Sequence, residues 1–158
     1  MVVIKPAQIS SFEAILLAHF PSDTARYFVP MKIGGSSKIA DEGAALILAG
    51  IKTATSSTPW HYSDGRMPFV GALSVLLDGA DRPRGIVETT RVQLVEFSAV
   101  DADFAYEYGE GPRTLEWWRE AIGEWYLADA AAHGRLFRPS SQIICEWFRL
   151  VARVGAGW

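Results

Sequence analysis

The stretch ALILAGIKTATSS, residues 45–57, combines a structural signal with a chemical one. Small and apolar residues run up to Gly50, a natural C-terminal stop for a helix, and one lysine, Lys52, then stands among threonines and serines. This order predicts a helix that ends at Gly50 and a chain that turns there into a loop or strand. Lys52 is then either a solvated charge at the helix end or a reactive amine held in a pocket beside Thr53 and Thr55.

Helical patterns lie on both sides of this stretch. Ser10 with Glu13 has the spacing of a capping box and opens a helix that stops near Pro21. Residues 21–35 hold two prolines and a Gly34-Gly35 pair, so we interpret them as a connecting loop. Three further helices are expected, from Ser36 or Ser37 to Gly50, from Ser98 or Asp101 to near Gly109, and from Thr114 to Gly134.

Three apolar or β-branched runs predict strands, at residues 73–78, 84–97 and 141–154. In the second run Val92 and Leu94 alternate with polar residues, as on a sheet with one buried face. A few strands separated by helices, without a regular βαβ alternation, predict an α+β fold. We expect a small, partly closed β-barrel with peripheral helices.

The composition is that of one globular domain. The chain has 158 residues, of which 49% are apolar and 21% charged. No apolar run reaches the roughly 20 residues of a membrane span, and the first residues lack the features of a signal peptide. A single cysteine, Cys145, agrees with a reducing compartment, and one cysteine with three scattered histidines gives no metal-ligand spacing. We expect a cytoplasmic protein without a metal, a cofactor or a membrane partner, and its oligomeric state stays open.

The net charge of −3 argues against a generic nucleic-acid coat protein. Residues 1–100 are balanced, with 9 basic and 9 acidic side chains, whereas residues 101–158 hold 6 basic and 9 acidic ones. A nucleic-acid ligand therefore needs a local basic groove. The candidates for such a groove are Lys32, Lys38, Lys52, Arg66 and Arg91.

Common motifs of nucleotide-binding loops, zinc proteases and serine hydrolases are absent from the sequence. What remains is Lys52 with its hydroxyl neighbours, the carboxylates Glu88 and Glu110, and two groups of aromatic residues. Four of these aromatic residues share one predicted helix and are expected mostly in the core: Trp117, Trp118, Trp125 and Tyr126. Three others follow the lysine segment in a polar loop, where they either stack on a base or close the barrel mouth: Trp60, His61 and Tyr62.

Ordered pieces of the chain resemble the longer bacterial-type members of the ASCH family. These pieces are LAGIKTAT (48–55), Val70-Gly71, LSVLLD (73–78), IVETT (86–90), EYGEG (107–111), LEWWREA (115–121) and IICEWF (143–148). The resemblance spans roughly residues 28–154. It predicts an ASCH-like domain at residues 28–158 and an N-terminal helical extension, residues 1–27, packed on that domain.

The resemblance implies a PUA-like β-barrel, a fold associated with RNA binding, with a cleft beside the G-x-K-T-x-T segment. Characterised relatives include small amidohydrolases that deacylate N4-acetylcytidine, and others reported as ribonucleases. By position, the catalytic set of the deacylating relatives falls on Lys52, Thr55 and Glu110, with Glu88 as the reserve carboxylate. The expected ligand is RNA or a pyrimidine nucleoside. The substrate-binding candidates are Thr53, Trp60, Tyr62, Glu88 and Arg91.

The chain departs from the family pattern at three places. Ser56 and Ser57 stand where many members have an arginine after the last threonine. Ile51 replaces a charged residue before the lysine, and Ala72 replaces an aspartate after a glycine. These changes bear on phosphate and substrate contacts, and they leave the amine, hydroxyl and carboxylate in place.

Lysine is a weak nucleophile or base at neutral pH because its ordinary pKa is about 10.4. Burial among apolar groups lowers that pKa, and a neutral Lys52 then attacks an amide carbonyl or activates water. In this hypothesis Thr55 orients the amine or stabilises an oxyanion, and a carboxylate carries the proton to the leaving amine. The alternative is a non-catalytic RNA- or nucleotide-binding module in which a charged, accessible Lys52 contacts phosphate. A third interpretation is an interaction domain that binds no ligand.

Overall fold

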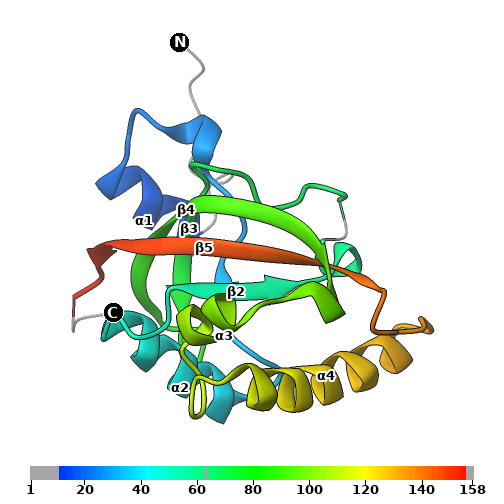
Figure 1. Cartoon of the computed structure of the whole chain (residues 1–158). Helices are drawn as coiled ribbons and strands as arrows, with labels where there is room; N and C mark the ends of the chain where they lie inside the picture. Colours follow the sequence, from blue (N-terminus) through cyan, green and yellow to red (C-terminus); the bar gives the residue numbers. More distant parts are fainter. Residues whose placement is uncertain (1–10, 63, 156–158) are drawn as a thin grey trace.

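The computed structural model describes residues 11–62 and 64–155 (Figure 1). Its centre is one five-stranded sheet in the order β1-β3-β4-β5-β2, where β1 runs parallel to β3 and the other neighbours are antiparallel. The two long strands β4 and β5 cross the whole molecule and curl the sheet into a half-barrel (Figure 1). The strands are β1 (Met31–Lys32), β2 (Ala54–Ser57), β3 (Leu73–Leu77), β4 (Pro83–Glu96) and β5 (Gln142–Arg153).

Four α-helices surround the sheet: α1 (Ser11–His19), α2 (Ser37–Leu48), α3 (Ala102–Tyr108) and α4 (Leu115–Ala132). The N-caps of three of them confirm the sequence prediction, because each side-chain oxygen accepts a backbone N–H: Ser36 from Ile39, Asp101 from Phe104 and Thr114 from Trp117. The predicted cap of the first helix, Ser10, lies outside the described residues. Short 3-10 helices are η2 (Thr24–Arg26), η3 (Pro59–His61) and η4 (Phe97–Ala99).

Two local predictions were wrong. Residues 21–35 are not only a loop, because they contain η2 and the edge strand β1, in which Met31 pairs with Leu76 of β3. A two-residue strand is specified by its partner and leaves no local pattern. Leu94 is 49% exposed although an inward position was expected. The pairing of β4 with β5 is regular from Arg91 to Glu96, so the alternation itself holds, but the face on which Leu94 lies is open to solvent at this position.

Hydrophobic clusters lie on both faces of the curled sheet. Ile15 and Leu16 of α1 pack with Val75 of β3, whereas Ile47 of α2 packs with the next residue of the strand, Leu76. Since successive strand residues point to opposite faces, α1 and α2 cover opposite sides of the sheet, as Figure 1 also shows. Helix α1 thus shares a core with the sheet. No helix in the described part of the chain is long and apolar enough to cross a membrane.

A third cluster joins α3 and α4 to β2 and β5. Its largest member is Trp118 of α4, which is fully buried and stacks on Phe97 with ring centroids 5.0 Å apart. Tyr126, two turns along the same helix, is also buried. The other two aromatic residues of this helix, Trp117 and Trp125, are only partly buried and point toward a cleft. The expectation of a mostly buried aromatic face therefore holds for two of the four residues.

Candidate functional site

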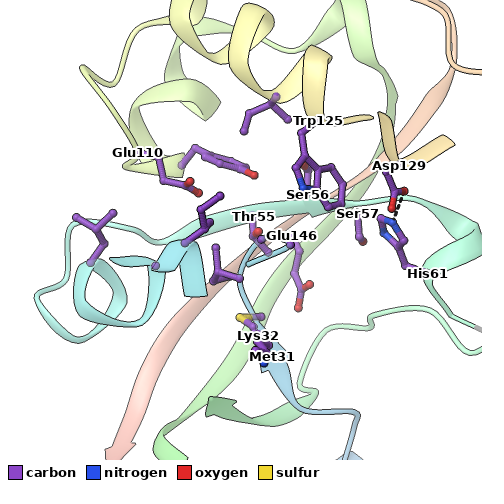
Figure 2. Close-up of a pocket in the computed structure, with 18 of the residues that line it drawn as sticks. Met31, Lys32, Thr55, Ser56, Ser57, His61, Glu110, Trp125, Asp129 and Glu146 are labelled. Carbon is purple, nitrogen blue, oxygen red and sulfur yellow. Dashed lines mark hydrogen bonds and ion pairs between the residues drawn. The ribbon is translucent and has the colours of Figure 1, made fainter. Parts of the chain in front are cut away.

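A cleft of about 790 Å³ opens between the helical layer and the sheet edge (Figure 2). Its walls come from the segment around β1, from α2, from β2 and from α4. A cleft of this volume accommodates a small organic ligand. Aromatic rings contribute much of the wall: Phe28, Tyr62, Tyr108, Trp117, Trp125 and Tyr126.

Lys52 lies directly behind the cleft wall. Its Nζ donates to Glu110 Oε2 at 2.7 Å and to the Tyr108 carbonyl at 3.0 Å, and it lies 3.4 Å from the centroid of the Tyr108 ring. The side chain exposes 0% of its surface, and Lys52 does not itself line the cleft. The interpretation of Lys52 as a solvated charge at a helix end is therefore wrong.

The end of α3 creates this environment. The backbone N–H of Thr53 donates to the Glu107 carbonyl at 2.9 Å, which docks the last turn of α3 against the lysine segment. Gly109 then ends the helix in the left-handed conformation at φ 75°, and the chain turns so that Glu110 faces Lys52. A lysine and a carboxylate 58 residues apart in sequence are brought into contact by one helix terminus.

The surroundings of Lys52 act on its pKa in opposite directions. Burial disfavours the charged ammonium and lowers the pKa from 10.5 to about 8, while the charge and hydrogen bond of Glu110 oppose this shift. A pKa near 8 leaves both protonation states accessible within about one pH unit of neutrality. Such a value in a cleft wall is typical of functional sites.

Thr55 and Glu110 both line the cleft, and the Glu110 side chain keeps 17% of its surface exposed. Thr55 lies on β2, and the hydroxyl of Tyr108 interacts with the Thr55 and Ser56 side chains. Burial nevertheless raises the pKa of Tyr108 far above its ordinary value, so this phenol stays neutral. The structure thus brings Lys52 into contact with Glu110, and Thr55 lines the same cleft as Glu110.

Of the predicted substrate-binding residues, Tyr62 lines the cleft and its hydroxyl lies 2.9 Å from Ser57 Oγ. Thr53 and Trp60 do not line it. The Thr53 hydroxyl donates to the Glu107 carbonyl at 3.3 Å, and the Trp60 indole donates to Asp129 at 2.9 Å. The edge of the Trp60 indole is therefore held by Asp129 of α4.

The remaining two candidates lie away from the cleft. Glu88 pairs with Arg26 and with Arg149, so the reserve carboxylate is held in an ion-pair network of its own. Arg91 lies 4.2 Å above the Trp147 ring on the exposed surface of β4. Neither residue belongs to the cleft lining.

The predicted basic groove does not form along the cleft. Of its five candidates only Lys32 lines the cleft, and the Lys32 amine is paired with Asp81 at 2.8 Å. The cleft instead carries four carboxylates: Glu42, Glu110, Asp129 and Glu146. An acidic lining repels phosphate and favours a neutral or cationic ligand. Within residues 11–62 and 64–155, no group of three or more His, Cys, Asp or Glu side chains is placed to hold a metal ion.

Two cleft residues escaped the sequence analysis. Glu146 is buried and lies inside the apolar run IICEWF. A single charged residue in such a run indicates a polar side chain that faces the interior. Asp129 of α4 accepts from His61 Nε2 at 2.7 Å (Figure 2) and from the Trp60 indole at 2.9 Å. Because His61 Nδ1 faces the Thr58 backbone N–H at 3.2 Å, Nε2 carries the hydrogen donated to Asp129. Nothing in the local sequence links Asp129 to a loop 68 residues away.

Replacement of Asp129 by asparagine should loosen the attachment of η3 to α4. Burial raises the pKa of Asp129, but the hydrogen bonds from Trp60 and His61 outweigh it and hold the pKa below 3.8. Stability from a lowered pKa is present above the unfolded value and is lost as pH falls through the folded one. We therefore expect Asp129→Asn to lower the Tm at pH 7, by about 2–4 °C for each kcal/mol lost. The difference from the wild type should shrink below pH 3.8.

The control for this experiment is Glu124→Gln, which removes an exposed carboxylate from the same helix. It should leave the Tm within the error of thermal melting. An Asp129→Asn protein that melts like the wild type at every pH would contradict the assigned role of the carboxylate.

Comparisons with known proteins agree with this architecture. A family model described as the ASCH domain matches residues 30–152. A solved ASCH domain from Lactobacillus crispatus is similar to this chain, with 28% sequence identity and a TM-score of 0.80. The alignment covers 94% of this chain and 99% of the Lactobacillus chain. A solved protein from Enterococcus faecalis is also similar, with 26% sequence identity and a TM-score of 0.77. Here the alignment covers 92% of this chain and 93% of the Enterococcus chain. No match is found among curated proteins.

These findings confirm the predicted α+β fold of the PUA-like kind, here a curled five-stranded half-barrel with helices. The match of the family model covers most of the chain and includes the lysine segment, β3, β4, α4 and most of β5. The chain belongs to the ASCH domain family.

Proposed function

We propose that the chain is an amide hydrolase that removes the acyl group from an N4-acylated cytidine. The observation that carries this proposal is the contact between the buried Lys52 amine and Glu110 at 2.7 Å, in the wall of a cleft that Thr55 also lines. A carboxylate at a cleft surface, held by a cation behind it, with a hydroxyl donor in the same cleft, suits acyl transfer to water.

The lining of the cleft supports a nucleoside as the substrate. ASCH domains generally bind RNA, which points to a ligand built from nucleotides. The carboxylates Glu42, Glu110 and Asp129 in the lining disfavour a phosphate backbone inside the cleft, whereas a nucleoside is neutral. Partly buried rings such as Trp117 and Trp125 offer faces for stacking on a base. A cleft of about 790 Å³ is large enough for one nucleoside.

In the proposed reaction a water molecule attacks the acyl carbonyl carbon. The Glu110 carboxylate takes the proton that the water loses, and the Thr55 hydroxyl donates to the oxyanion that develops. The bond between the acyl carbon and N4 then breaks, and the Glu110 proton passes to the leaving N4. The products are a carboxylic acid and cytidine.

Lys52 acts in this proposal as an ammonium. Its Nζ has three partners that favour the charged form, namely a carboxylate, a carbonyl and the face of an aromatic ring. With a pKa of about 8, roughly nine tenths of Lys52 carry the charge at pH 7. Because the side chain has no exposed surface, direct attack by its amine requires movement of the wall. Lys52 is therefore a positioning residue, and the hypothesis of a neutral nucleophile becomes the alternative to be tested.

Burial of Lys52 also weighs against the binding module in which this lysine contacts phosphate. A phosphate ligand needs an accessible cation, and the Lys52 side chain is covered on all sides. The Lys52 amine already donates a hydrogen bond to Glu110 at 2.7 Å. A binding-only function would have to use other residues.

The wild-type protein should convert N4-acetylcytidine to cytidine, with a pH profile set by Lys52. We expect kcat/KM to fall about tenfold per pH unit above pH 8, because the free enzyme loses the Lys52 proton with a pKa of about 8. The measurement is chromatographic separation of cytidine from its acetyl derivative between pH 6 and 10, with single-stranded RNA assayed in parallel.

A rate that instead rises through pH 8 would show that neutral Lys52 is the active form and would overturn the role given to Glu110. Cleavage of RNA without deacylation of N4-acetylcytidine would show that RNA, and not the acylated nucleoside, is the substrate. Inactivity toward both substrates would refute the proposed hydrolase activity.

A further inference from the structure

Glu146 is a second carboxylate on the floor of the cleft. It lies on β5, exposes 4% of its surface and lines the cleft together with Thr55. Thr55 and Glu146 are directly paired residues of the antiparallel strands β2 and β5. Side chains paired in this way point to the same face of the sheet with their Cβ atoms about 4.5–5.5 Å apart. Glu146 is therefore an immediate neighbour of the proposed oxyanion donor.

The Glu146 carboxyl is incompletely satisfied by the protein. Oε2 accepts from the Thr89 hydroxyl at 2.6 Å, which fixes the orientation of the group. Among the described residues Thr89 is its one hydrogen-bond partner, and no cationic side chain lies within ion-pair distance. In Figure 2 the carboxyl extends from the strand below Thr55, on the side away from Glu110. Among the described residues the buried side-chain polar atom without a hydrogen-bond partner is Trp118 Nε1, so the second oxygen of Glu146 keeps access to the cleft, where a ligand can bind it.

We propose that Glu146 recognises the edge of the bound base, through an acceptor ring nitrogen and the N–H donor beside it. The inference rests on the proposed function and names its specificity determinant. In an N4-acylated cytosine those atoms are N3 and N4–H, and N4 carries the acyl group. A base held by this edge at Glu146 directs the acyl carbonyl toward the adjacent Thr55, since the two side chains are cross-strand neighbours.

The chemistry of Glu146 matches such an edge. Burial raises the pKa of its carboxyl, and the hydrogen bond from Thr89 opposes that shift. In its protonated form, which burial favours, this carboxyl offers an O–H donor and a carbonyl acceptor side by side. These two groups are complementary to a ring nitrogen and its neighbouring N–H, and a bidentate pair with a base is worth about 1–3 kcal/mol of discrimination.

The experiment compares the binding of three nucleosides at pH 7 by isothermal titration calorimetry. The probes are cytidine, 3-deazacytidine, which lacks the ring acceptor, and the pyrimidin-2-one ribonucleoside, which lacks the amino donor. We expect the wild type to bind cytidine about tenfold or more tightly than either analogue. Glu146→Leu should bind all three weakly and alike. Glu146→Gln should keep the preference for cytidine, because an amide presents the same donor and acceptor.

Glu42→Gln is the matched control, since Glu42 also lines the cleft but its side chain is 61% exposed. It should leave the preference unchanged, and thermal melting should show that all variants fold. A preference for cytidine that survives Glu146→Leu overturns the inference, as does a wild type without any preference. These binding outcomes do not depend on turnover. A wild type that prefers cytidine but hydrolyses no acylated cytidine refutes the proposed reaction alone.

Discussion

Replacing Lys52 by methionine should abolish the hydrolysis of N4-acetylcytidine, with a loss in kcat/KM of about 10²–10⁴-fold, the range typical of lost acid–base catalysis. Methionine has a similar length and no charge, so Glu110 loses the cation that holds it at 2.7 Å. The carboxylate is then free to rotate, and this change removes the base that faces the substrate. Steady-state assays at pH 7 measure this loss.

Folding must be separated from catalysis in this variant. Removing one member of a buried ion pair commonly costs about 3–5 kcal/mol, whereas replacing both members is often close to neutral. The double variant Lys52→Met/Glu110→Gln therefore should melt closer to the wild type than Lys52→Met does, and should still be inactive. Restored activity in the double variant would exclude the pair from the reaction.

Lys52→Arg distinguishes the two protonation states of the lysine. Arginine keeps a positive charge and does not lose its proton in proteins. If the ammonium is the working form, this variant retains part of the activity, and its rate no longer declines above pH 8. If a neutral amine is required, it is inactive at every pH. Its larger guanidinium enters a site with no free surface, so thermal melting has to accompany the assay.

The local structure around the site followed from local signals in the sequence. Thr114 was predicted as a cap, and Ser36 and Asp101 were each one of two candidates, because capping depends on the residue and the few that follow it. The end of α2 at Gly50 was predicted for the same reason, since Gly50 has a φ of 75°. Local patterns also identified three of the five strands, each long enough to show its own composition.

What the sequence could not supply was contact between distant segments. The pairing of Lys52 with Glu110 was inferred only through a family resemblance, because no spacing rule links residues 58 positions apart. The acidic character of the cleft was missed for a related reason, since its four carboxylates come from four separate segments of the chain. Glu146 was read as part of an apolar strand, although its charge within that run was the available clue.

The backbone contact that places Lys52 leads to the second large effect. Gly109 ends α3 against the lysine segment, and a Cβ atom at this position would lie 2.5 Å from the Ile51 carbonyl oxygen and 2.7 Å from Lys52 Cα. Both contacts are with backbone atoms, which cannot rotate away. An alanine here must push the end of α3 away from Lys52, and with it the Tyr108 carbonyl and Glu110 that hold the amine.

We therefore expect Gly109→Ala to reduce kcat/KM by about 10²-fold, because displacement of a reacting group by about 1 Å costs that much. Part of any loss in stability will come from placing alanine at φ 75°. Gly50→Ala isolates that part, since Gly50 has the same φ of 75°, lies two residues from Lys52, and would bring its Cβ within 4 Å of nothing. Urea denaturation should give the Gly109 variant an additional loss of about 1–3 kcal/mol, the usual cost of overpacking. If the two alanine variants are equally stable and equally active, the docking of α3 does not set the position of Lys52.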